Sequence, residues 1–165
     1  EPTSGNGQRD EQKPPSAPVS ERPRFHLAFP VHDLAVAREF YVELLGCAVG
    51  RSSARWIDFD FYGHQIVAHL VETEQAVSPQ NPVDGDEVPA SHFGVILPWE
   101  EWEACVEGLR RGGTTFLIGP RVRFVGQAGE QATVFFADPS GNALELKAFR
   151  DPEAVFARDL SAPRT

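Results

Sequence analysis

The stretch RFHLAFPVHDLAVAREFYVELLG, residues 24–46, changes its hydrophobic period part-way along. It begins with a short apolar run bounded by Pro and Asp, which is typical of a β-strand. Asp33 then precedes a segment whose apolar residues recur at helical spacing, and Gly46 ends that segment. The stretch therefore predicts a strand followed directly by a capped helix.

The residues after this helix read as extended. In WIDFDF (56–61), acidic residues and Trp56 alternate with Ile57, Phe59 and Phe61, which is the period of a half-buried strand. Turn-like breaks separate the predicted extended segments, which span residues 47–51, 55–63 and 64–71. The first part of the chain is therefore predicted to be a β-α-β-β-β unit.

The same order of elements repeats in the second half of the chain. A polar, proline-containing stretch, 72–90, is predicted to be a long connection. After it come a predicted strand, a helix ending at a Gly-Gly pair and three extended segments, at 91–98, 99–113, 114–120, 131–139 and 142–149. The chain is therefore interpreted as an internal duplication.

Composition limits the classes of protein to consider. The 165 residues suit one domain, and a net charge of −9 with a pI near 5.0 argues against a nucleic-acid-binding surface. No apolar run is long enough for a membrane span or a secretory signal, so a soluble cytoplasmic protein is expected. The chain contains no Met, which leaves N-terminal processing and an organellar location open. Cys47 and Cys105 are too far apart for a CxxC pair and are predicted to be free thiols.

The two ends of the chain are predicted to lie outside the domain. Residues 1–23 are rich in Pro, Ser, Gly and charged residues and contain almost no large apolar side chain. Such a segment cannot offset the entropy of ordering, so it is expected to be disordered. The domain is expected to span residues 24–149, and 150–165 are interpreted as a C-terminal extension.

Four potential metal ligands are predicted to occupy equivalent places in the opening and closing strands of the two repeats, with Glu145 as the counterpart of His69. The opening strands contain His26 and His92, and the closing strands contain His69 and Glu145. A carboxylate in an apolar strand costs several kcal/mol unless a cation lies nearby, which favours a metal beside Glu145. Pairing with Lys147, two residues along the same face, is the alternative.

Three stretches of the chain resemble one protein family. RFHLAFPVHDLAVAREFYVELLG, SHFGVIL and FADPSGNALELKAF are similar to the strand–helix and closing-hairpin motifs of the vicinal oxygen chelate superfamily. The resemblance implies an α+β fold in which two tandem βαβββ modules, about 24–71 and 91–149, form a curved cup around one divalent metal. It also implies that His26, His92 and Glu145 are metal ligands, and that His69 occupies a position that is a ligand in some members.

The donor set and the resemblance together predict a small-molecule enzyme. Two imidazoles and one carboxylate favour Fe(II), whereas adding His69 makes Zn, Ni or Mn suitable. A dioxygenase-like reaction is expected, with Glu145 and His69 as the catalytic groups. The alternatives are a glyoxalase I-like lyase or isomerase, which the absence of a Glu at residue 69 disfavours, and a non-catalytic protein that binds an aromatic compound or an antibiotic.

The substrate-binding residues are expected to come from both repeats. Arg123, Phe124 and Gln131 lie in the predicted connection 121–131, which forms either a substrate wall or a solvated loop, and Trp56 is the candidate from the first repeat. A homodimer is one arrangement to consider, because two modules can form the cup within one chain or across two chains.

Overall fold

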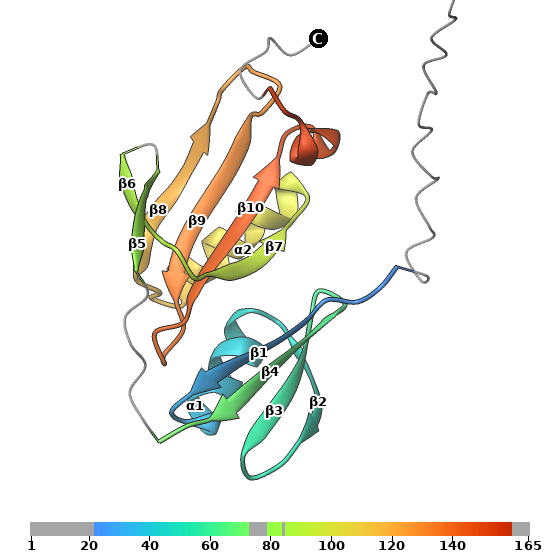
Figure 1. Cartoon of the computed structure of the whole chain (residues 1–165), viewed down its shortest axis with the longest axis vertical. Coiled ribbons are helices and arrows are strands. Elements are labelled where there is room, and N and C mark those ends of the chain that lie inside the picture. Colours follow the sequence, from blue (N-terminus) through green and yellow to red (C-terminus); the bar gives the residue numbers. More distant parts are fainter. Residues whose placement is uncertain (1–21, 73–78, 84, 160–165) are drawn as a thin grey trace, which may run out of the picture.

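The structure is a computed structural model and describes residues 22–72, 79–83 and 85–159. Almost all of the predicted disordered tail, 1–23, lies outside the described residues. The β-structure of the described residues consists of two four-stranded sheets and a two-stranded hairpin (Figure 1). The predicted α+β fold of two tandem βαβββ modules is confirmed.

The first module contains six elements and a mixed sheet. Its sheet has the order β1-β4-β3-β2, with β1 parallel to β4 and the other pairs antiparallel. The Asp33 carboxylate accepts hydrogen bonds from the backbone N–H groups of Ala35 (2.8 Å) and Val36 (3.0 Å), which caps the helix as predicted. The helix changes to a π-helical turn in its second half. The elements are β1 (His26–Val31), α1 (Leu34–Glu39), the π-turn (Phe40–Leu44), β2 (Ala48–Ser52), β3 (Trp56–Phe61) and β4 (His64–Leu70).

The second module repeats this arrangement, with the sheet order β7-β10-β9-β8. Trp102, Val106 and Leu109 form the buried stripe of its helix. The edge strand β8 ends later than predicted. It extends to Arg123, into the region 121–131 that was interpreted as a connection. The elements are β7 (Phe93–Ile96), α2 (Trp99–Arg111), β8 (Phe116–Arg123), β9 (Gln131–Ala137) and β10 (Ala143–Phe149), and a 3₁₀ turn (Pro152–Phe156) follows.

The predicted connection 72–90 contains a β-hairpin, which the sequence interpretation missed. Its strands are β5 (Gln80–Val83) and β6 (Asp86–Pro89). Each strand contains a proline, and a proline is tolerated in a two-stranded ribbon because both strands are edges. The hairpin lies beside β8 in Figure 1, and its Val88 packs with Ile118 and Phe135.

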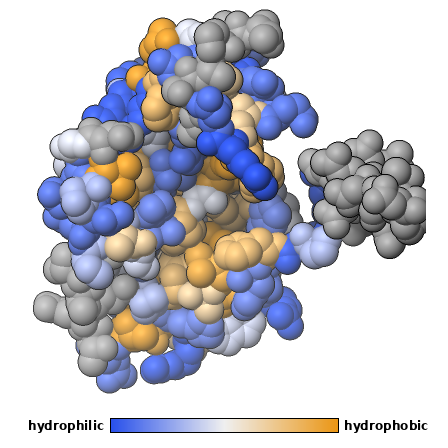
Figure 2. Space-filling model, turned by 45° about the horizontal axis from the view of Figure 1, so that its top comes forward, coloured by the Kyte–Doolittle hydropathy of each residue, from blue (hydrophilic) through white to orange (hydrophobic). Residues whose placement is uncertain are grey.

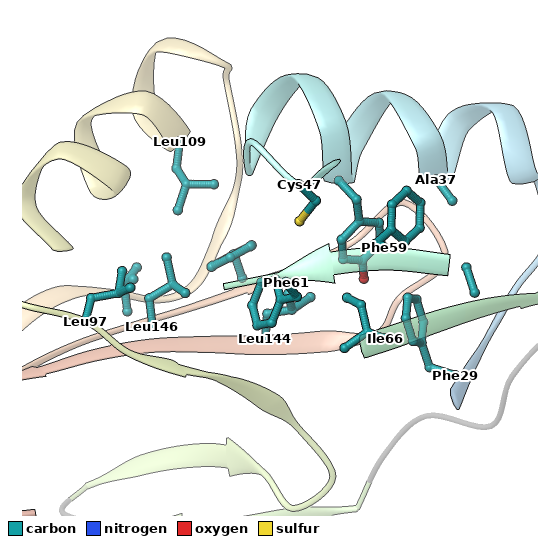
Figure 3. Close-up of a cluster of buried hydrophobic side chains, with 14 of the residues drawn as sticks. Phe29, Ala37, Cys47, Phe59, Phe61, Ile66, Leu97, Leu109, Leu144 and Leu146 are labelled. Atoms are coloured by element: carbon teal, nitrogen blue, oxygen red, sulfur yellow. The ribbon is translucent and has the colours of Figure 1, made fainter. Parts of the chain in front are cut away.

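One hydrophobic core serves both modules. The helices of the two modules lie on the same side of this core, which contains residues from both sheets (Figure 3). The ring of the fully buried Tyr41 stacks on Phe59 with a centroid distance of 5.1 Å. Cys47 is buried in the same core, and both cysteines are free. None of the helices in the described ranges is long and apolar enough to cross a membrane.

The turn between β9 and β10 ties the second module to the first. The Tyr41 hydroxyl donates to the Asp138 carboxylate (2.9 Å), and the Asn142 amide donates to the Pro30 carbonyl (2.9 Å). The backbone N–H of His32 donates to the Ser140 hydroxyl (3.1 Å). The turn therefore anchors the modules to each other as well as reversing the chain.

Candidate metal-binding site

His92 and Glu145 meet on the second sheet. His92 directly precedes β7, and Glu145 lies on β10, the parallel neighbour of β7. The Nε2 atom of His92 is 3.3 Å from the Oε2 atom of Glu145. In the strand register Glu145 pairs with Gly94, and a Cβ added to Gly94 would overlap the Glu145 carbonyl oxygen. The close approach of the two strands therefore requires glycine at this position.

A backbone carbonyl fixes the His92 ring. The Nδ1 atom lies 2.7 Å from the carbonyl oxygen of Pro89, at the end of β6. A carbonyl oxygen accepts hydrogen bonds only, so Nδ1 carries the proton and Nε2 faces Glu145. The edge of the ring also packs against Phe135, with a centroid distance of 5.1 Å. A histidine held in this way presents one nitrogen in a fixed direction, as metal-ligating histidines do.

The two oxygens of Glu145 have different surroundings. The Thr133 hydroxyl donates to Oε1 at 2.5 Å, and the Lys147 ammonium is 3.7 Å from the same oxygen. Oε2 faces His92. The pairing with Lys147 that the sequence suggested as an alternative therefore exists together with the His92 contact. The side chain of Glu145 is only 11% exposed, so these contacts hold a largely buried charge.

The two groups shift each other's pKa in opposite directions. The hydrogen bond from Glu145 raises the pKa of His92 above its ordinary value, against the effect of burial. Burial alone would raise the pKa of Glu145, but the hydrogen bonds from His92 and Thr133 outweigh it, and this pKa is lowered. The pair therefore favours a carboxylate next to an imidazolium, and a metal ion bound here would take the place of the Nε2 proton.

His26 lies on the first sheet, at the start of β1. Its Nδ1 atom is 2.8 Å from the side-chain oxygen of Gln65 on β4, its partner in the strand register. It lines a cavity of about 470 Å³ between the ends of the strands, together with Arg51, Asp58 and His64. The first module thus offers the His26 imidazole beside an open cavity that His64 also lines.

His69 is not the register counterpart of Glu145, which corrects the sequence interpretation. Glu145 pairs with Gly94, two residues beyond His92, whereas His69 pairs with Pro30, four residues beyond His26. The counterpart of Glu145 in the first module is Val67, which pairs with Ala28. The physical reason is that a two-residue shift along a strand keeps a side chain on the same face, so alternation alone does not reveal it.

The structure brings together two of the four predicted ligands. His92 and Glu145 are in contact on the second sheet, while His26 and His69 lie on the first sheet. Within the described ranges no three His, Cys, Asp or Glu side chains gather closely enough to hold a metal ion.

The predicted substrate residues also divide between the sheets. Arg123 donates to the Asp86 carboxylate of the hairpin (3.2 Å) and pairs in register with the buried Gln131. Phe124 follows directly in a left-handed conformation, with a φ of 55°. Trp56 pairs with His69 on the first sheet.

Sequence reasoning did not single out the groups that orient the side chains of these candidate ligands. Thr133, Gln65 and the Pro89 carbonyl make contacts between neighbouring strands or segments. The polar Thr133 in the apolar run QATVFFA was the one available signal in the sequence.

A scan of family models matches residues 25–146 to the Glyoxalase/Bleomycin resistance protein/Dioxygenase superfamily. The match covers most of the chain and both modules. The chain belongs to this superfamily. It is the vicinal oxygen chelate superfamily, so the resemblance inferred from the sequence is confirmed.

Solved structures of superfamily members have the same fold. A glyoxalase/bleomycin resistance protein/dioxygenase from Alicyclobacillus acidocaldarius is 32% identical, with a TM-score of 0.68 over 81% of this chain and 96% of that chain. An integron cassette protein from the mobile metagenome of the Halifax Harbour sewage outfall is 26% identical, with a TM-score of 0.59 over 78% of this chain and 99% of that chain. The fosfomycin resistance protein FosX from Listeria monocytogenes is 19% identical (TM-score 0.60, 77% and 93%) and shows the fold alone. No curated protein matches the chain.

Proposed function

We propose that this protein is a divalent-metal-dependent enzyme that acts on a small molecule, with His26, His92 and Glu145 as the metal ligands. The observation that carries the proposal is the His92–Glu145 pair, in which the Pro89 carbonyl directs the imidazole Nε2 toward the carboxylate. A structural ion pair needs no such fixed tautomer, whereas a metal site does.

The chemistry of the donor set fits a divalent cation. Two imidazoles and one carboxylate on one side of a metal leave positions open for substrate, which favours Fe(II) and suits Mn, Ni or Zn less specifically. Such a metal would supply Lewis acidity toward neighbouring oxygen atoms of a substrate. Thr133 and Lys147 hold Oε1 of Glu145, so that Oε2 stays directed at the site.

A dioxygenase-like reaction is favoured over a glyoxalase I-like one. Isomerisation of that kind needs a carboxylate base near the metal, and the first-module counterpart of Glu145 is Val67, which is apolar. The proposed ligands His26, His92 and Glu145 form a two-histidine, one-carboxylate set, which is typical of Fe(II) oxygenases. His69 lies farther along β4, beside Trp56, where it is suited to contact substrate or to transfer a proton.

The substrate is proposed to lie over the second sheet. Arg123, Phe124 and Gln131 would form one wall, next to the β5–β6 hairpin that also positions His92. Trp56 would contribute an aromatic wall from the first sheet. Such a mixture of aromatic and cationic groups suits an aromatic or anionic small molecule.

The complete donor set is proposed to form across two copies of the chain. His26 lies on one sheet and the His92–Glu145 pair on the other. Large apolar side chains are exposed near both groups, with Phe25 next to His26 (59% exposed) and Ile96 opposite Lys147 in the register (45% exposed). In Figure 2 hydrophobic residues gather near the middle of one face, with hydrophilic residues around them. A homodimer would cover such residues and join the two half-sites.

Metal analysis after anaerobic reconstitution tests the proposal. We expect about one divalent metal per chain in the wild type, and loss of that metal in the Glu145→Ala variant. Oxygen uptake with catechols in the Fe(II) form alone would support the dioxygenase. Activity of the Ni or Zn form on a thiol hemithioacetal, without oxygen, would instead assign the isomerase. A wild type without metal, or full occupancy in Glu145→Ala, would contradict the ligand assignment.

Mixing two inactive variants tests the assembly across chains. His26→Ala and Glu145→Ala each remove one ligand, so homodimers of either variant should lack metal. A mixed dimer has one site with both changes and one site with neither. We expect co-refolded mixtures to regain up to about a quarter of the wild-type metal content, since half of the dimers are mixed and each has one intact site. No regain in a mixture shown to contain mixed dimers would place the ligands of each site in one chain.

A further inference from the structure

The side-chain amide of Gln65 lies between His26 and a buried carboxylate. Its Oε1 atom is 2.8 Å from Nδ1 of His26, and its Nε2 atom donates to Oδ2 of Asp58 at 3.1 Å. Asp58 is on the neighbouring strand β3 and is only 7% exposed. The guanidinium of Arg51, on β2, is 3.4 Å from the same Oδ2 atom. Four strands therefore contribute to one polar chain that ends at a proposed metal ligand.

The order of donors along this chain follows from Asp58. A carboxylate accepts hydrogen bonds, so the neighbouring end of the Gln65 amide must be the NH₂ group. The other end of the amide is then the carbonyl oxygen, which also accepts only. The His26 nitrogen that faces this oxygen must therefore carry the proton.

We propose that Gln65 and Asp58 are positioning residues that hold His26 in the Nδ1–H tautomer and leave its Nε2 lone pair for the metal. The inference rests on the proposed function for the role of the metal, but the tautomer itself is a property of the metal-free protein. Metal-ligating histidines commonly donate their second ring nitrogen in this way, and such partners affect metal affinity without touching the metal.

The two proposed histidine ligands would thus share one tautomer, which is fixed by different means. For His92 the acceptor is the Pro89 carbonyl, which no substitution removes. For His26 the acceptor is a side chain, whose direction depends on another side chain. The first-module ligand is therefore the one whose tautomer can be changed by mutation.

Nitrogen-15 NMR of the histidine rings in metal-free protein tests this directly, because the shifts report which nitrogen carries the proton. We expect His26 to be Nδ1–H in the wild type. In Gln65→Lys the ammonium can only donate, so the His26 nitrogen that faces it must accept, and the tautomer should change to Nε2–H. Gln65→Glu keeps an acceptor and should retain Nδ1–H. An Nε2–H ring in the wild type, or the same tautomer in Gln65→Lys, would overturn the proposal.

Titration with Fe(II) or Zn(II) gives the second measurement. We expect Gln65→Leu and Asp58→Leu, which remove the amide and its acceptor respectively, to weaken metal binding about ten- to a hundredfold, and Gln65→Glu to stay within a fewfold of the wild type. Gln80→Leu on the exposed strand β5 is the matched control and should bind as the wild type does. Unchanged affinity in Gln65→Leu, in a variant that remains folded by circular dichroism, would contradict the positioning role. A wild type that binds no metal would contradict the proposed function instead, while the NMR result would still decide the tautomer.

Discussion

The two modules share a backbone frame but differ in the chemistry placed on it. Each has a histidine at or directly before the start of its first strand, and the Nδ1 atom of this histidine is hydrogen bonded to a side chain in the first module and to the backbone in the second. Opposite the residue two positions beyond this histidine, the first module has Val67 and the second has Glu145. The comparison teaches that a duplicated fold repeats positions rather than functions, so each half must be analysed through its own contacts.

Gly94 on β7, which pairs with Glu145 in the strand register, provides the sharpest test of this difference between the modules. Gly94 and Ala28 occupy corresponding positions, but only the second-module position excludes a Cβ. We expect Gly94→Ala to lower the free energy of unfolding by about 3 kcal/mol, because the Glu145 backbone must move, and to lower metal content as well.

Urea denaturation measures the free energy of unfolding of Gly94→Ala relative to the wild type. Gly108→Ala in α2 is the control, because a Cβ there meets nothing within 4 Å, and it should stabilise the helix by about 0.5 kcal/mol. Equal stability of Gly94→Ala and the wild type would show that the two modules tolerate the same side chains at this position.

The closing hairpins of the modules differ almost as much. Three residues before the glycine of each turn lies an aspartate, exposed Asp60 in the first module and buried Asp138 in the second. Asp60 accepts one bond, from Gly63, whereas Asp138 accepts bonds from Tyr41, Ser140 and Asn142. We expect Asp138→Ala to cost about 2–3 kcal/mol and Asp60→Ala about 0.5–1 kcal/mol. Equal losses by thermal or urea unfolding would contradict the view that the second turn anchors the modules.

A smaller effect is expected where Thr133 supports the carboxylate. Thr133→Val removes the hydroxyl that donates to Oε1 of Glu145 and keeps the shape of a side chain that is 2% exposed. We expect metal affinity to fall about tenfold. The measurement is a competition titration with a chelator, and the matched first-module change is Gln65→Leu. Unchanged affinity in Thr133→Val would mean that the strand alone orients Glu145.

The smallest effect concerns alkaline pH. Burial and the nearby Asp138 raise the pKa of Tyr41 well above its ordinary value. An unfolded tyrosine loses its proton near pH 10, while the folded Tyr41 keeps it, so the unfolded state binds fewer protons and stability falls as pH rises above about 10. Replacing Tyr41 with Phe should reduce this fall by up to about 1.4 kcal/mol per pH unit. Parallel slopes for the two proteins would show that Tyr41 ionises equally in both states.

Much of the fold follows from local patterns in the sequence. The Asp33 cap, the alternation in WIDFDF and the end of α2 at a Gly-Gly pair depend on neighbours a few residues apart, and all were predicted. The β5–β6 hairpin was missed because its prolines are typical of loops. The position of His69 was misjudged because strand period gives the face of a residue but not its register.

The sequence by itself determined the duplication, the order of strands and helices within each module and the family, because these depend on periodicity, turn residues and motifs within single segments. Only the tertiary structure decided that Glu145 meets His92, that Gln65 lies between His26 and Asp58, and that Tyr41 reaches Asp138 across 97 residues of chain. The physical reason is that hydrogen-bond partners on different strands are chosen by register and packing, which the periodicity of one segment does not contain.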